Sequence, residues 1–196
     1  MQALERIHPT KPSRPGLVEL REFEYVRHGT LCLIANWDVV NGGLLSPTIG
    51  CSRSEAVFAN HIAQTIDTDP EASWVFIADR LNTHMSATLV ELVAKRCGIT
   101  ELGVKGEHGI LKSQASRLAF LAEPTHRIRF VYTPRHASWL NQIEIWFSIL
   151  ARKVLRRGSF DSLEALSKRV LEFIDYYNDV LAKPFRWTYT GRPLRA

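Results

Sequence analysis

The order of its segments predicts a mixed α/β fold for this chain, with a sheet flanked by helices. Trp74–Ala78 is a short, wholly apolar run, typical of a strand covered on both faces, and Ile128–Tyr132 is a second strand. A hairpin is expected from Thr30–Val40 and Leu44–Ile49, because an Asn-Gly-Gly sequence separates these runs. The resulting order, β-β-α-β-α-β-α-α, predicts a sheet with helices on its faces.

Apolar spacing and capping residues predict the helices. Ser54 is a plausible N-cap for a first helix, and Gly98 is a stop for a second one. Asp161, with Glu164 three residues on, resembles a capping box that opens the last helix. The expected helices are Ser54–Ile66, a helix from Asn82 or Thr83 through Arg96, a short one around Lys112–Leu121, Asn141–Arg157, and a last one from Asp161.

Length and composition predict one reduced, globular domain. The chain has 196 residues, of which 45% are hydrophobic and 23% charged, and this usage excludes a disordered or fibrous protein. Its 3 cysteines form no CxxC, which argues against a disulfide scaffold and a structural zinc site. No apolar run approaches the ~20 residues needed to cross a bilayer, so we expect a cytoplasmic protein. Residues 8–16, rich in proline, should form an extended arm.

Positive charge gathers in the last third of the chain. Residues 126–196 hold 13 Lys/Arg against 6 Asp/Glu, a net +7, whereas residues 1–125 hold 12 against 14, a net −2. This asymmetry indicates a surface for a polyanion, nucleic acid first among them. A solvated basic helix face is the alternative interpretation.

Two carboxylates are candidate site residues because of where they lie. Asp79 follows an apolar strand, where open α/β sheets place ligands, although it could instead cap the following turn. Glu144 falls in the first turn of a predicted helix, where the helix dipole alone would favour it. We expect the Glu144 side chain to border the core rather than project into water.

Two sequence blocks carry a family resemblance. Residues 79–84 (DRLNTH) place a histidine five positions after an aspartate, and residues 134–144 (PRHASWLNQIE) contain Trp-Leu-Asn-x-x-Glu after a strand and a proline. The second block is specific, and the first alone is weak. Together they resemble the second and third acidic motifs of mariner-type bacterial insertion-sequence transposases of the DDE superfamily. The likeness extends from residues 2–6 to residues 183–188.

This resemblance implies an RNase-H-like fold and a single transposase catalytic domain over residues 1–196. The implied function is metal-dependent DNA cleavage and strand transfer at transposon ends. Asp79 and Glu144 would be catalytic and metal-binding members of an Asp-Asp-Glu triad that holds two Mg²⁺ or Mn²⁺ ions. Carboxylate oxygens suit these hard cations. Implied partners are DNA, as transposon ends and target, and a second copy of the chain in a homodimer, with no membrane.

The DNA-binding candidates come from the same blocks and from the basic helix. Phosphate contacts are expected from Arg152, Lys153, Arg156 and Arg157, along the helix that carries Glu144. His84 and Asn141 are further DNA-binding candidates. His84 could instead support the site from behind or be a plain polar residue at a helix start, and Asn141 could simply cap its helix.

The sequence departs from the family pattern in three places. The opening strand, with the first catalytic Asp, is expected to be absent, and Asp38 is only a weak substitute for it. Residues 99–125 are expected to be an insertion that widens the spacing between Asp79 and Glu144. Arg80 stands where relatives carry Asn or Gln, which puts a cation beside the Asp79 carboxylate. A catalytically inactive remnant that keeps a DNA-binding RNase-H-like fold is therefore the alternative to an active transposase.

Overall fold

The computed structural model describes residues 1–135, 137 and 140–186. Trp139 of the third motif, and Trp187 and Thr188 near the C-terminus, lie outside the described residues. The described strands form three separate pairs, β1–β2 and β3–β4 antiparallel and β5–β6 parallel. The fold is thus mixed α/β, as predicted. The described pairs are not hydrogen-bonded to one another, so they do not form the single sheet that the sequence predicts.

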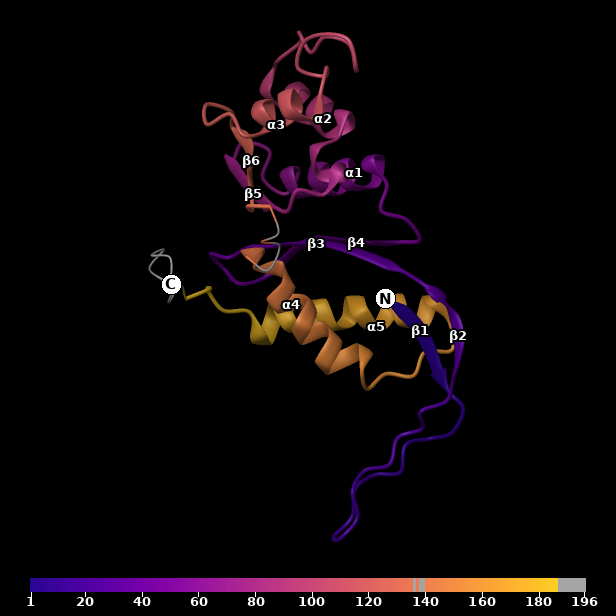
Figure 1. Cartoon of the computed structure of the whole chain (residues 1–196). Helices are drawn as coiled ribbons and strands as arrows, with labels where there is room; N and C mark the ends of the chain where they lie inside the picture. The colour runs from indigo at the N-terminus through magenta and orange to yellow at the C-terminus, as the bar shows by residue number, and fades with distance from the viewer. Residues whose placement is uncertain (136, 138–139, 187–196) are drawn as a thin grey trace, which may run out of the picture.

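One group of elements, which we call the antiparallel unit, surrounds the first four strands (Figure 1). A core around Trp146, Leu166 and Ile174 holds it together. Helices α4 and α5 contact β3 and β4 respectively. Its elements are β1 (Gln2–Arg6), β2 (Tyr25–Thr30), β3 (Cys32–Trp37), β4 (Leu44–Gly50), α4 (Ile143–Leu150), the π-helical turn η3 (Ala151–Leu155), α5 (Leu163–Tyr176) and the π-helical turn η4 (Tyr177–Leu181).

The second group, the parallel unit, has its own core around Ile62, Leu89 and Phe130. In Figure 1 it lies on the other side of the β3–β4 pair from α4 and α5. Its elements are α1 (Glu55–Ile66), β5 (Trp74–Ala78), the 3-10 helix η1 (Asn82–Met85), α2 (Ala87–Cys97), α3 (Gln114–Leu121) and β6 (Ile128–Tyr132).

Helix α1 of the parallel unit also contacts the antiparallel unit. It contacts α2 on one side and β3 and β4 on the other, so the β3–β4 pair lies between α1 and the α4–α5 layer. Polar side chains fill this junction. The amide of Asn36 on β3 lies 2.9 Å from Nε2 of the fully buried His61 and donates to Thr65 Oγ1 at 2.7 Å, and Thr48 on β4 contacts His61 Nδ1 at 2.9 Å. Burial lowers the pKa of His61 to about 4.

Capping residues account for most helix starts. Ser54 accepts a hydrogen bond from Val57 N, which confirms the predicted N-cap of α1. The second helix begins later than predicted, because Ser86 caps α2 while residues 82–85 form the separate turn η1. The capping box predicted at Asp161 is also wrong, since Ser162 is the N-cap of α5 and accepts from Ala165 N.

The β5–β6 pair is covered on one face only. Val75, Ile77 and Val131 are 51%, 48% and 44% exposed, while Phe76 and Phe130 between them are buried. The prediction that Trp74–Ala78 is covered on both faces is therefore wrong. The helices that contact β6 are α2 and α3, and the opposite face has no described helix packed on it.

Two long connecting segments differ in how far they pack on the rest of the chain. In the segment 99–125, Leu111, Phe120 and Leu121 are buried in the core of the parallel unit, so this stretch supports the fold as well as extending it. The connection between β1 and β2, residues 7–24, projects as a narrow arm (Figure 1) held by bridges such as Lys11 with Leu20. Within the described residues, no helix is long and apolar enough to cross a membrane.

Candidate active site and nucleic-acid interface

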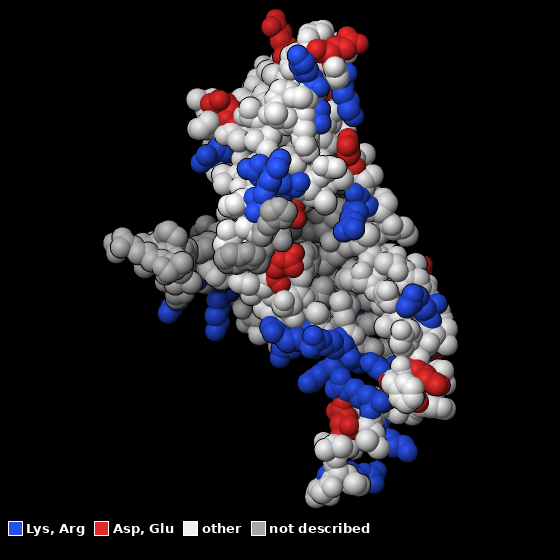
Figure 2. All heavy atoms as spheres, in the orientation of Figure 1, with Lys and Arg blue, Asp and Glu red and all other residues white. Residues whose placement is uncertain are grey.

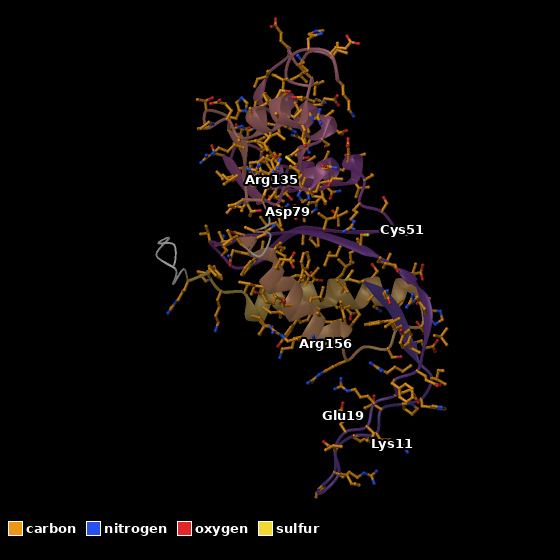
Figure 3. All side chains as sticks on the ribbon, in the orientation of Figure 1. Lys11, Glu19, Cys51, Asp79, Arg135 and Arg156 are labelled. Atoms are coloured by element: carbon orange, nitrogen blue, oxygen red, sulfur yellow. The ribbon has the colours of Figure 1, made fainter. Side chains whose placement is uncertain are left out.

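Asp79 sits at the carboxyl end of the parallel pair. Ala78 pairs with Tyr132, so the chain leaves β5 at Asp79 and leaves β6 at Thr133 along the same edge. Figure 3 shows Asp79 and Arg135 close to the boundary between the two units. Because β5 and β6 are parallel, the loop after β6 leads from this edge toward α4 and Glu144. The carboxyl edge of parallel strands is where α/β folds place ligands.

One oxygen of the Asp79 carboxylate is held by two donors. Oδ1 accepts from Leu81 N at 3.2 Å and lies 2.7 Å from His84 Nδ1. The side chain is 37% exposed, and no described residue hydrogen-bonds to its Oδ2. The carboxylate therefore has a fixed orientation and one oxygen open to a ligand.

Arg80 turns toward the neighbouring strand rather than toward Asp79. Its Nε donates to the backbone oxygen of Thr133 at 3.2 Å, and its positive charge acts on Tyr132. No ion pair joins Arg80 to Asp79. The arginine therefore joins the loop after β5 to the loop after β6. The residue that departs from the family pattern thus stabilises the strand ends beside Asp79.

Glu144 lies in the first turn of α4 and is exposed. Its backbone nitrogen donates to Asn141 O, and Asn141 Oδ1 accepts weakly from Ile143 N at 3.4 Å. The expectation that Glu144 borders the core is wrong. The buried face of α4 is set by Trp146 and Leu150, four residues apart, and a residue two positions before Trp146 falls on the opposite side of the helix.

The structure does not bring a third ligand to these carboxylates. Among the described residues, no three or more His, Cys, Asp or Glu side chains cluster closely enough to hold a metal ion. Asp38 is engaged in the β3–β4 turn, where Oδ1 accepts from Val40 N at 2.8 Å and Oδ2 from Asn41 Nδ2 at 2.6 Å. Its oxygens stabilise the turn, which leaves Asp79 and Glu144 as the candidate metal ligands.

The predicted DNA-contacting arginines and lysine are all exposed. Val154, in the same helical stretch, is buried in the core and fixes which side of it faces solvent. None of the basic side chains forms an ion pair with a described acidic residue. Figure 2 shows Lys and Arg gathered over the α4–η3 side of the molecule and continuing toward the arm. We call this surface the basic stripe; it comprises Arg152, Lys153, Arg156 and Arg157.

Comparison with known proteins decides the family. Residues 3–167 match the family described as DDE superfamily endonuclease. The chain belongs to this family. The matched region contains β2 to β6, all of β1 except its first residue, Asp79, Glu144 and the basic stripe. Membership implies a DNA substrate and transposase-like nuclease chemistry, for which enzymes of this family typically use divalent metals. No curated protein and no solved structure matches the chain.

Some residues around Asp79 have no sequence signal that would reveal them. Phe58 on α1 packs against the His84 ring, and the Tyr132 hydroxyl donates to His84 O at 2.8 Å. Phe58 lies in an ordinary apolar pattern, and only the folded chain brings it to the site. Tyr132 is the last residue of a predicted strand, a position that suggests proximity to the edge but not its hydrogen bond.

Proposed function

We propose that this chain is the catalytic domain of a mariner-type insertion-sequence transposase, which cleaves DNA at transposon ends and joins the ends to target DNA. The observation that carries the proposal is where the two carboxylates lie in a chain of the DDE endonuclease family. Asp79 directly follows β5, and Glu144 lies on α4, the helix after β6, and these two parallel strands end at the same edge. The Trp-Leu-Asn-x-x-Glu block supports the mariner assignment within that family.

The two carboxylates have the chemistry that Mg²⁺ or Mn²⁺ requires. Both side chains reach solvent, so a cation bound there keeps its water ligands, and the Asp79 Oδ2 has no competing partner among the described residues. When bound, paired ions stabilise the charge on the attacking and leaving oxygens of the phosphodiester. Asp79 and Glu144 would hold this metal, and Arg80 would hold the loop after β5 against the loop after β6.

DNA binding is assigned to the basic stripe, with Asn141 at the start of the same helix as a further candidate. Arg152 and Lys153 lie on η3, which continues directly from the Glu144 helix, and Arg156 and Arg157 follow it, so phosphates bound there would lie along the path to the carboxylates. If ~6 phosphates are neutralised, affinity should fall about a thousandfold between roughly 50 and 200 mM salt. A homodimer on paired ends is part of the proposal by analogy with relatives.

An inactive DNA-binding remnant is the second candidate function. It is favoured by a specific observation, namely that the described residues offer no third side chain to Asp79 and Glu144. In this alternative, the fold and the basic stripe are kept, while the metal pair is not completed by the chain.

The deciding experiment measures Mg²⁺-dependent nicking and strand joining on DNA that carries transposon ends. Wild type should be active, and Asp79→Ala and Glu144→Gln should lose activity while still binding DNA. Wild type with no more activity than Asp79→Ala, but with salt-sensitive DNA binding, identifies the remnant.

The basic stripe is tested separately by DNA affinity. Replacing Arg152, Lys153, Arg156 and Arg157 by Ala should weaken binding and flatten its salt dependence. The matched control replaces Lys95 and Lys112, exposed lysines of the parallel unit, and should bind as wild type does. Equal affinity of both variants would remove the stripe from the interface.

A further inference from the structure

His84 lies five positions after Asp79 in the sequence, contacts its carboxylate, and is itself held by neighbouring residues. It lies in η1, the 3-10 turn between β5 and α2, and its side chain is 18% exposed. Its Nδ1 is 2.7 Å from Asp79 Oδ1 and 3.2 Å from the Asp79 backbone oxygen. The ring therefore meets both the carboxylate and the main chain of one residue.

These contacts decide which ring nitrogen carries hydrogen. The Asp79 carboxylate, in its ionised form, and the Asp79 carbonyl are both acceptors with no hydrogen to donate. Nδ1 must therefore be the donor, whatever the state of Nε2. A histidine in this arrangement acts on Asp79 as a fixed N–H group.

Two aromatic residues from other elements hold His84, Phe58 at its ring and Tyr132 at its backbone oxygen. Phe58 of α1 lies against the ring, with centroids 4.2 Å apart and planes inclined by 33°. Tyr132 at the end of β6 donates its hydroxyl hydrogen to His84 O at 2.8 Å. Burial raises the pKa of Tyr132, so that hydroxyl keeps its proton and stays a donor. Helix α1, the η1 turn and strand β6 thus converge on one histidine.

We propose that His84 is a positioning residue for Asp79: its Nδ1–H holds Oδ1 so that Oδ2 is presented to the divalent cation. This inference rests on the proposed function, because it assumes that Asp79 is a metal ligand. It replaces DNA contact as the role of His84. The half-buried ring is already committed on one nitrogen to Asp79 and on one face to Phe58. Hydrogen-bond partners of metal ligands typically contribute 10–100-fold to metal affinity or activity.

The first test needs no metal. Long-range ¹⁵N–¹H spectra of the metal-free protein report which imidazole nitrogen of His84 is protonated. We expect a protonated Nδ1 in wild type, and a change in the His84 signals in Asp79→Ala. A His84 with hydrogen on Nε2 alone, or with signals unchanged in Asp79→Ala, would overturn the proposal.

The second test measures Mn²⁺ affinity by titration of the purified chain. His84→Phe keeps an aromatic ring against Phe58 but loses the donor, and should bind Mn²⁺ about 10–100-fold more weakly. His84→Asn places an amide N–H near the position of Nδ1 and should restore most of the loss. The matched control is His126→Phe, because His126 also packs on a phenylalanine, Phe120, at 4.6 Å in the same unit and has no contact with Asp79.

The outcomes separate the two proposals. Mn²⁺ binding that depends on Asp79 but is equal in His84→Phe and wild type would overturn the positioning role alone. Mn²⁺ binding that is unaffected by Asp79→Ala would overturn the metal-ligand role of Asp79, and with it the proposed catalytic function. A loss in His84→Phe that His84→Asn does not restore would show that an N–H group at this position is not what Asp79 requires, and would also overturn the inference.

Discussion

The antiparallel unit is enclosed on both faces of its β3–β4 pair, whereas the parallel unit leaves one face of β5–β6 open. Helix α1 covers one side of β3–β4, and α4 and α5 cover the other. Val75, Ile77 and Val131 instead form an exposed apolar strip, in which Ile77 and Val131 are direct neighbours across the pair. The half-open unit carries Asp79, and the enclosed unit carries Glu144 and the basic stripe. The candidate site therefore depends on the contact between these two differently packed units.

The junction between the units differs from both cores. Each core is apolar, but the contact of α1 with β3 and β4 contains His61, Asn36, Thr48 and Thr65 joined by hydrogen bonds. Buried polar groups stabilise a junction only while every partner is present, and a missing partner costs the full desolvation of the other. The relative placement of the units is thus fixed by directional bonds as well as by packing.

The largest expected effect comes from the enclosed core. Trp146 is fully buried, so Trp146→Ala should lower the free energy of unfolding by about 3–5 kcal/mol. Chemical denaturation measures the loss, and hydrogen exchange should quicken first in β3, β4 and α5. Phe130→Ala in the other core is the matched variant and should affect β5 and α2 first. Uniform acceleration over the whole chain in both variants would mean that the units are one cooperative body.

The junction should weaken in acid. The pKa of His61 is about 4 in the folded protein, below its ordinary value of 6.5, so the unfolded chain binds the proton more tightly. Stability from this residue is complete above pH 6.5 and is lost as the pH falls toward 4, a difference of about 3 kcal/mol. Unfolding of wild type and His61→Leu should be compared at pH 7 and 4.5. An equal pH dependence in the two proteins would contradict the assignment.

A smaller effect is expected at the edge of the enclosed unit. Asn178 accepts from Leu44 N at 2.8 Å and donates to Leu44 O at 3.0 Å, replacing a neighbouring strand at the start of β4. Asn178→Ala should therefore cost about 1–3 kcal/mol in chemical denaturation. Asp179→Ala, an exposed neighbour in the same turn, serves as the control and should be close to neutral. Equal stability of both variants would show that Leu44 finds water instead.

The smallest effect is expected on the open face. Ile77→Thr changes a side chain that is 48% exposed and should alter stability by no more than about 0.5 kcal/mol. Phe76→Ala, one position earlier on the buried face, should be far more costly. Thermal unfolding of both variants is sufficient. A loss above about 2 kcal/mol for Ile77→Thr would show that something covers this face in solution.

Local patterns predicted much of the fold. Ile128–Tyr132 and Trp74–Ala78 are found with the expected limits, the Asn-Gly-Gly turn separates β3 from β4, and Ser54 caps α1. Gly42 in that turn has φ +82°, which explains the need for glycine. Strands β1 and β2 were not predicted, since neither alternates clearly in hydrophobicity and their pairing is set by contacts between distant segments. The open face of β5–β6 could not be predicted either, because an apolar run does not specify what packs on it.

The individual residues of the candidate site could be singled out from the sequence, but their contacts and exposure could not. Asp79, Glu144 and His84 stand out from motif spacing, and the position of Asp79 after a strand is as expected. The bond from His84 to Asp79 was not predicted, because it needs the η1 turn to end at Ser86 rather than continue as a helix. The exposure of Glu144 follows from its angle relative to Trp146, which a broad apolar stripe leaves undefined.

The arm between β1 and β2 has a consequence for how this chain can change over generations. Leu17, Val18 and Phe23 are 68%, 78% and 83% exposed, and residues 7–24 contribute no side chain to either described core. Mutations there meet little resistance from folding, so any constraint on the arm must come from what it touches outside its own chain. Its length and sequence should therefore diverge faster between relatives than the strands it joins, and it is the natural place to graft a tag or a new recognition element.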